Sequence, residues 1–198
     1  MENTKKEKKK MTIKDWIDLL ITVVIALSIS LILFRCIIFH GSVPTQSMDP
    51  TIKTTSFIIG NRLPILFDRT GKNIKRYEVI TFKSDEGDKN ERLMVKRVIG
   101  LPGEHMKITE TDIYVNGQKL RKDFVSSEDV AQMPDEFDIP EGCFFVAGDN
   151  RNNSYDSRKW NDKFVKKKDI KAKIIFNYWY WHIEKLKTYE DNIKKADI

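Results

Sequence analysis

The chain has 198 residues and a formal net charge of +6, and this length suffices for one folded domain with a small insertion. Most of the excess charge lies at the N-terminus, because six lysines and two glutamates among the first 14 residues leave +4 there. A nucleic-acid-binding domain usually carries its basic residues as a patch on a folded surface, so this distribution argues against nucleic acid as a partner.

Two cysteines, Cys36 and Cys143, match no metal-binding or redox spacing, and the three histidines are isolated, so we expect no metal site and no cofactor.

A long apolar run follows the lysines. It extends from Leu19 to Phe39, and its one charged residue, Arg35, lies near its end. Crossing a bilayer takes about 20 residues, and cytoplasmic flanks are enriched in lysine. We therefore predict a cytoplasmic tail over residues 1–15, a transmembrane helix over 16–39 and an extracytoplasmic domain over 40–198.

Two other interpretations of this run are weaker. A helix buried in a soluble core seldom has so long and uniform an apolar surface beside a lysine-rich flank. A cleaved signal peptide has an apolar region of about 7–15 residues followed by a small-x-small site, and residues 40–43 offer no convincing site of that kind. We therefore predict a retained anchor.

Short apolar runs between turn formers continue from Gly41 onward, so the remaining domain is predicted to be mainly β. Asn116-Gly117 is a strong signal for a two-residue hairpin. The acidic stretch Ser126–Glu141, with two prolines, is interpreted as an excursion from the core. The predicted strands are Ser56–Asn61, Glu78–Lys83, Leu93–Ile99, Glu104–Thr109, Ile113–Val115, Lys119–Leu120, Cys143–Ala147 and Ile174–Tyr180.

Three segments of this domain carry reactive side chains. In Pro44–Thr51, two prolines bracket Ser47 and restrict the backbone, which suits a nucleophile held in a fixed geometry. In Val95–Gly103, Lys96 lies in an apolar strand that ends in a turn. Gly148–Arg158 is a polar loop that directly follows a predicted strand. Taken singly, each segment has an ordinary explanation as a loop serine, a solvent-facing lysine or a set of turn hydrogen bonds.

Taken together, and in this order behind an N-terminal membrane helix, the three segments resemble the type I signal peptidases of bacteria. The resemblance runs from the anchor through about Val165, while Glu104–Glu141 matches poorly. It implies a β-rich catalytic domain with a small inserted β subdomain, the family's variable insertion, at about residues 104–142. The departures from the family pattern are Gln46, Ala172 and Glu104, and they affect local loop geometry and substrate fit.

The resemblance also implies a role for individual residues. Ser47 matches the nucleophile and Lys96 the general base of a serine endopeptidase. Thr45 matches a side-chain donor of the oxyanion hole, and Ser154 matches a residue that orients the lysine. The remaining matches are an ion-pair framework formed by Arg97, Asp149, Asp156 and Arg158, and a pocket for small substrate side chains lined by Val43, Met48, Ile52 and Val95.

The chemistry of such a pair requires a neutral lysine. A serine hydroxyl is a poor nucleophile until a base takes its proton, and an unperturbed lysine has a pKa of about 10.4. The apolar neighbours of Lys96 and the adjacent Arg97 both disfavour a charge on the lysine. The resemblance accordingly implies that the partners are the lipid bilayer and the signal peptides of exported preproteins, which are cut at the outer face of the cytoplasmic membrane.

Two other functions share part of this pattern. Self-cleaving repressors of the SOS type share a Ser/Lys pair, but they are soluble and carry a DNA-binding domain, whereas this chain has a predicted anchor. An anchored domain that binds exported chains without cutting them is expected to have lost Ser47, Lys96 or Ser154, and all three are present. Eukaryotic-type signal peptidases usually carry histidine in place of Lys96, which favours a bacterial source.

Overall fold

The computed structural model describes residues 12–68, 70–84, 92–121, 134–179 and 182–185. The chain divides into two compact units, Met1–Ile37 and Ile38–Ile198. The first unit holds one long helix, and the second holds two antiparallel sheets. The chain is therefore mainly β behind an N-terminal apolar helix, as the sequence predicts.

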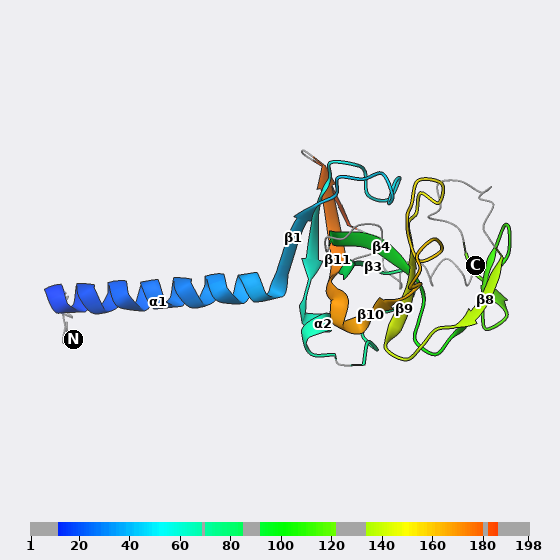
Figure 1. Ribbon diagram of the computed structural model, residues 1–198. Helices are drawn as coiled ribbons and strands as arrows, with labels where there is room; N and C mark the ends of the chain where they lie inside the picture. The colour runs from blue at the N-terminus through cyan, green and yellow to red at the C-terminus, as the bar shows by residue number, and fades with distance from the viewer. Residues whose placement is uncertain (1–11, 69, 85–91, 122–133, 180–181, 186–198) are drawn as a thin grey trace, which may run out of the picture. The chain divides into compact units, whose positions relative to one another are not determined.

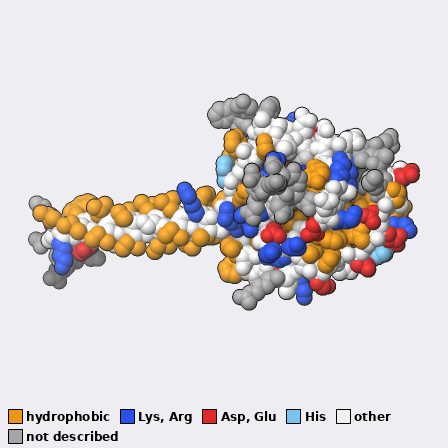
Figure 2. Space-filling model, viewed as in Figure 1, with side chains coloured by type: hydrophobic (Ala, Val, Ile, Leu, Met, Phe, Trp, Pro, Cys, Tyr) orange, Lys and Arg blue, Asp and Glu red, His pale blue; other side chains and the backbone are white. Residues whose placement is uncertain are grey.

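Helix α1 spans Ile13–Ile37, and none of its residues is buried within the protein. Thr12 and Asp15 exchange side-chain and backbone hydrogen bonds at its start and satisfy N–H groups there. Its 25 residues extend roughly 38 Å at 1.5 Å per residue, which exceeds the apolar thickness of a bilayer, about 30 Å. Apolar side chains cover the helix on the face seen in Figure 2. This helix has the length and composition of a membrane span.

The predicted helix end at Phe39 is wrong by two residues. Ile38 and Phe39 already belong to strand β1, Ile38–Ser42, and Phe39 is buried among apolar side chains of the second unit. Continuous hydrophobicity from Leu19 to Phe39 hides the boundary, because the same residue types suit a lipid-facing helix and a buried strand.

The larger sheet contains eight strands (Figure 1), and every pairing that we describe in it is antiparallel. Its order is β1, β2 (Phe57–Asn61), β11 (Ile170–Trp179), β3 (Val79–Ser84), β4 (Arg92–Gly100), β9 (Cys143–Ala147) and β10 (Val165–Lys166), while β12 (His182–Lys185) pairs with β11. Two short helical turns, α2 (Leu63–Leu66) and η1 (Lys167–Asp169), precede β3 and β11. Strand β4 lies inside the sheet between β3 and β9, so both of its edges are hydrogen-bonded.

The smaller sheet has the order β7 (Gln118–Lys119), β6 (Ile113–Val115), β5 (His105–Ile108) and β8 (Asp135–Asp138). It is the inserted β subdomain that the sequence predicts, and Figure 1 shows β8 at the end of the domain opposite β1. Asn116 and Gly117 connect β6 and β7 with φ angles of 49° and 79°. Positive φ at both central residues is the signature of a type I′ turn, so the predicted hairpin is confirmed.

A shared apolar core attaches the smaller sheet to the larger one. Ile99 of β4 and Phe145 of β9 pack in one cluster with Met106 and Ile108 of β5. Two further clusters lie in the larger sheet, one around Phe82 and Phe144 and one around Met48 and Ile58. Packing on both sides buries β4 from Lys96 through Gly100, which includes a lysine and an arginine.

The sequence predicts most strands to within one or two residues, but it misses β1, β8, β10 and β12 and begins β11 four residues late. Strand β8 is the instructive case. Its sequence is Asp-Glu-Phe-Asp, and it lies at the edge of the small sheet, where charged side chains suit the solvent-facing positions. Within Ser126–Glu141, residues 135–138 therefore belong to a sheet, and Phe137 packs on the shared core. Residues 122–133, and the predicted strand end at Tyr180, lie outside the described residues.

Candidate active site

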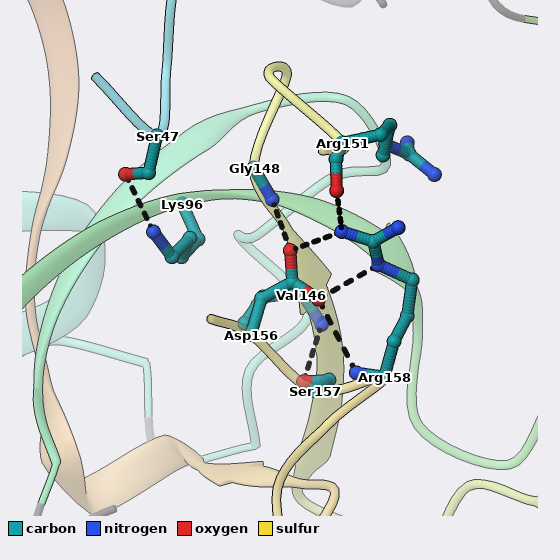
Figure 3. Close-up of polar contacts among 8 residues, drawn as sticks. All are labelled: Ser47, Lys96, Val146, Gly148, Arg151, Asp156, Ser157 and Arg158. Atoms are coloured by element: carbon teal, nitrogen blue, oxygen red, sulfur yellow. Dashed lines mark hydrogen bonds and ion pairs between the residues drawn. The ribbon is translucent and has the colours of Figure 1, made fainter. Parts of the chain in front are cut away.

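Ser47 and Lys96 meet although 49 positions separate them. Ser47 lies in the turn that follows β1, and Lys96 lies within β4. The Nζ atom of Lys96 is 2.6 Å from Oγ of Ser47 (Figure 3), and the two residues are only 5% and 6% exposed. An ammonium here donates to the hydroxyl, while a neutral amine accepts the hydroxyl proton. The pair therefore has the geometry that proton transfer from serine to lysine requires.

The environment of Lys96 favours the neutral form. The pKa of Lys96 is lowered from 10.5 to about 8; burial is the largest cause, and the nearby Arg158 guanidinium also lowers it. Asp156 and Asp149 act in the opposite direction, since an anion stabilises an ammonium. Because burial outweighs the two carboxylates, a substantial fraction of Lys96 is uncharged at mildly alkaline pH.

Thr45 lies beside Ser47. Its Oγ1 is 3.2 Å from Oγ of Ser47, and Thr45 itself is exposed. Within the described part of the chain, no hydrogen bond engages the backbone N–H of Ser47. A hydroxyl and a backbone N–H next to the same serine are the kinds of donor that stabilise an oxyanion.

The polar loop after β9 is organised by two buried ion pairs. Arg97 of β4 contacts both carboxylate oxygens of Asp149, with distances of 2.8 and 2.6 Å. Arg158 contacts Asp156 with Nε and Nη2, each at 2.8 Å, and its Nη2 also donates to the carbonyl of Arg151 (Figure 3). The backbone N–H of Gly148 donates to Asp156 over 2.9 Å. The two pairs thus connect the start of the loop to its end and the whole loop to β4.

Asp156 is ionised in this setting. Burial raises the pKa of its carboxyl. The hydrogen bonds and charge of Arg158 and the N–H of Gly148 lower this pKa by a larger amount, so the net pKa lies below the ordinary value. A buried charge that is fully paired in this way fixes loop geometry, because leaving either partner alone in the interior is costly.

Ser154 lies close to Ser47 but does not bond to Lys96 in this structure. It is buried, and its hydroxyl makes no well-aligned hydrogen bond with the described residues, although it lies near enough to Asp156 to lower the pKa of that carboxyl. A Cβ placed on Gly148 would come within 2.3 Å of both Ser154 Oγ and the carbonyl oxygen of Ser47. Gly148 thus lets the loop approach the backbone of Ser47, while the predicted orienting role of Ser154 stays a prediction.

The four predicted pocket residues belong to one apolar cluster. Val43, Met48 and Ile52 are buried in it, and Val95 packs against it while partly exposed. The cluster lies around the turn that carries Ser47, since Met48 follows Ser47 and Ile52 ends the turn. Whether these residues frame a pocket for substrate stays a prediction.

Three residues outside the predicted site contribute to its geometry. Asn150 donates its N–H to the carbonyl of Ser47 over 3.1 Å. Tyr77 adopts a φ of 69°, which bulky residues rarely occupy, and its carbonyl accepts a hydrogen bond from Arg97. Thr51 donates to Asp149 over 2.5 Å. No signal in the sequence identifies these residues, because each acts through a partner that is distant along the chain.

Comparisons with known proteins agree on one family. A family model described as signal peptidase, peptidase S26, matches residues 13–179. Signal peptidase I of Bacillus licheniformis is 33% identical over 169 residues, which cover 80% of this chain and 84% of the relative. The probable signal peptidase I-2 of Synechocystis is 25% identical over 182 residues, which cover 90% of this chain and 80% of the relative. A crystal structure of a signal peptidase I from Enterococcus faecalis V583 is 31% identical, covers 50% of this chain and 95% of that one, and has a TM-score of 0.43.

Proposed function

Because the chain belongs to the signal peptidase family, peptidase S26, we propose that it cuts signal peptides from exported preproteins with a Ser47/Lys96 dyad at the outer face of the cytoplasmic membrane. As a member of this family it is a hydrolase that removes signal peptides. The observation that carries the dyad is the 2.6 Å contact between Lys96 Nζ and Ser47 Oγ in a setting that excludes most solvent.

The reaction begins with neutral Lys96. Its Nζ takes the proton of the Ser47 hydroxyl as Oγ attacks the scissile carbonyl, which gives a tetrahedral oxyanion. Thr45 Oγ1 and the backbone N–H of Ser47 donate to that oxyanion, and the loss of one such donor typically costs about 2.7–4 kcal/mol of transition-state stabilisation. The Lys96 ammonium then protonates the leaving amine as the peptide bond breaks, which leaves an acyl-enzyme on Ser47 and a neutral lysine.

Water then hydrolyses the acyl-enzyme, again with Lys96 as the general base. Neutral Lys96 takes a proton from water, the resulting hydroxide attacks the ester carbonyl, and the ammonium returns the proton to Ser47 Oγ as the acyl group leaves. Ser154 orients the lysine between these steps by turning its hydroxyl toward Nζ. The buried Arg97–Asp149 and Asp156–Arg158 pairs keep the loop in place while charge moves through the dyad.

We assign substrate selection to Val43, Met48, Ile52 and Val95. These side chains are apolar, and Val43, Met48 and Ile52 are buried while Val95 is partly exposed, so a pocket that opens here for substrate is expected to be shallow and to accept only small groups. Small residues such as alanine are therefore expected one and three positions before the cut.

Orientation in the membrane follows from the lysines. The predicted tail over residues 1–15 stays in the cytoplasm, helix α1 crosses once, and the domain from about residue 40 onward lies outside. Arg35 in the last turn of α1 can extend its guanidinium to the headgroups. A cleavage site that emerges just beyond a membrane-embedded signal peptide is then on the same side of the membrane as Ser47.

The dyad predicts that Ser47→Ala and Lys96→Ala each lower kcat on a preprotein by at least about 10³-fold, because each variant removes a reacting group. Purified full-length protein in detergent is incubated with a preprotein, and the N-terminus of the product is sequenced. Ser42→Ala and Lys107→Ala, which alter exposed residues of the same types, serve as controls and are expected to be fully active. A folded Ser47→Ala or Lys96→Ala variant with near-normal activity contradicts the dyad.

The pocket assignment predicts that phenylalanine at the position just before the cut lowers kcat/KM by about a hundredfold or more relative to alanine. As a control, phenylalanine is placed one residue earlier, where the side chain of an extended peptide points to the opposite face, and this substrate is expected to be cut well. Efficient cutting of the first substrate would refute the assignment.

The topology predicts that protease added to right-side-out membrane vesicles digests the domain that contains Ser47 and spares a tag placed before Lys5. Detergent lysis provides the control, since both parts then become accessible. Protection of the domain in intact vesicles reverses the orientation and removes the basis for cleavage outside.

A further inference from the structure

Thr51 lies in the same turn as the proposed nucleophile. Residues 46–52 form a closed turn, in which Asp49 N–H donates to the Gln46 carbonyl over 3.1 Å and Ile52 N–H donates to the Met48 carbonyl over 2.8 Å. Ser47 and Thr51 are four positions apart within it. Any group that fixes Thr51 therefore also limits the movement of Ser47.

The hydroxyl of Thr51 takes part in the buried Arg97–Asp149 pair. Its Oγ1 donates to Oδ2 of Asp149 over 2.5 Å and accepts a hydrogen bond from Nη2 of Arg97 over 3.2 Å. The carboxylate of Asp149 is fully buried, and hydrogen bonds to an ionised group are stronger than those between neutral groups. Thr51 is therefore held by both members of the ion pair.

The backbone of Thr51 is held from a different strand. Its carbonyl oxygen accepts a hydrogen bond from Nδ2 of Asn177 over 3.1 Å, and Asn177 is a buried residue of β11. The turn is thus hydrogen-bonded to β11 through the Thr51 carbonyl and to the loop after β9 through the Thr51 hydroxyl.

Three segments that carry parts of the proposed machinery meet at this point. Strand β4 contributes Arg97, the neighbour of Lys96, and the loop after β9 contributes Asp149. The turn contributes Thr51. The Arg97–Asp149 pair joins β4 to the loop. The hydroxyl of Thr51 bonds the turn of Ser47 to this pair, beside the backbone bond from Asn150 N–H to the Ser47 carbonyl.

We infer that Thr51 is a positioning residue that sets the distance between Ser47 Oγ and Lys96 Nζ through its hydrogen bonds to Asp149 and Arg97. The inference deepens the proposed function and rests on the Ser47/Lys96 dyad. Thr51 makes no hydrogen bond to Ser47 or Lys96, so it would act through Asp149 and Arg97. Its effect is expected in kcat, since a misplacement of about 1 Å between reacting groups can cost 10²-fold in rate.

The test compares three variants of the full chain in detergent on one preprotein substrate. Thr51→Val removes the hydroxyl at nearly constant shape, and Thr51→Ser keeps it. Thr54→Val makes the same change three residues further along, at a threonine whose hydroxyl makes no hydrogen bond with the described residues. Steady-state kcat and KM and the thermal unfolding midpoint are measured for each, with Ser47→Ala alongside.

Thr51→Val is expected to lower kcat by about tenfold to a hundredfold with KM within about twofold, at a temperature well below its unfolding midpoint. Thr51→Ser is expected to restore most of kcat, and Thr54→Val to match the unchanged protein. The inference is overturned if Thr51→Val keeps a normal kcat, if its deficit disappears on cooling away from the unfolding midpoint, or if Thr51→Ser is equally impaired.

The same experiment separates this inference from the proposed function. An inactive Ser47→Ala variant with a fully active Thr51→Val variant overturns only the role of Thr51. An active Ser47→Ala variant overturns the dyad, and with it the inference that depends on it.

Discussion

A lysine side chain held out of water against a serine hydroxyl is the interaction on which the rest of this structure depends. An ammonium in solution prefers to keep its proton, and removing it at moderate pH requires an environment that makes the charge costly. Strand β4 supplies that environment, because it lies between β3 and β9 with apolar clusters packed around it and is buried from Lys96 onward. The turn after β1 then brings Ser47 to within 2.6 Å of the amine.

The charges around this pair have to be balanced for the lysine to become neutral. Asp149 and Asp156 both lie near enough to raise the pKa of Lys96, and unpaired carboxylates would stabilise the ammonium further. Each is paired with a guanidinium, Asp149 with Arg97 and Asp156 with Arg158. The loop therefore gains the rigidity of buried ion pairs, while burial remains the largest influence on Lys96.

Local features were predictable from the sequence, and long-range contacts were not. The Asn116-Gly117 hairpin follows from two adjacent residues, and the strands rich in β-branched residues follow from their composition. Strand β1 was missed because its apolar residues continue the membrane run, and β8 because its acidic sequence suits an exposed edge. Within the site, only the family resemblance predicted that Ser47 and Lys96 would be partners. The contact of Thr51 with Asp149 joins residues 98 positions apart, and no pattern along the chain indicates it.

The central claim is that Lys96 acts as a neutral base, and the pH dependence of kcat/KM tests it most directly, because this quantity reports the ionisation of the free enzyme. The pKa of Lys96 is lowered to about 8, mainly by burial, and the neutral, active form predominates above that value. We expect kcat/KM for a fixed preprotein, measured from about pH 6 to 10 in one detergent, to rise roughly tenfold per pH unit and to level off above an inflection near 8. A profile that is flat below pH 8, or that keeps rising toward the ordinary lysine pKa of about 10.4, would contradict the account.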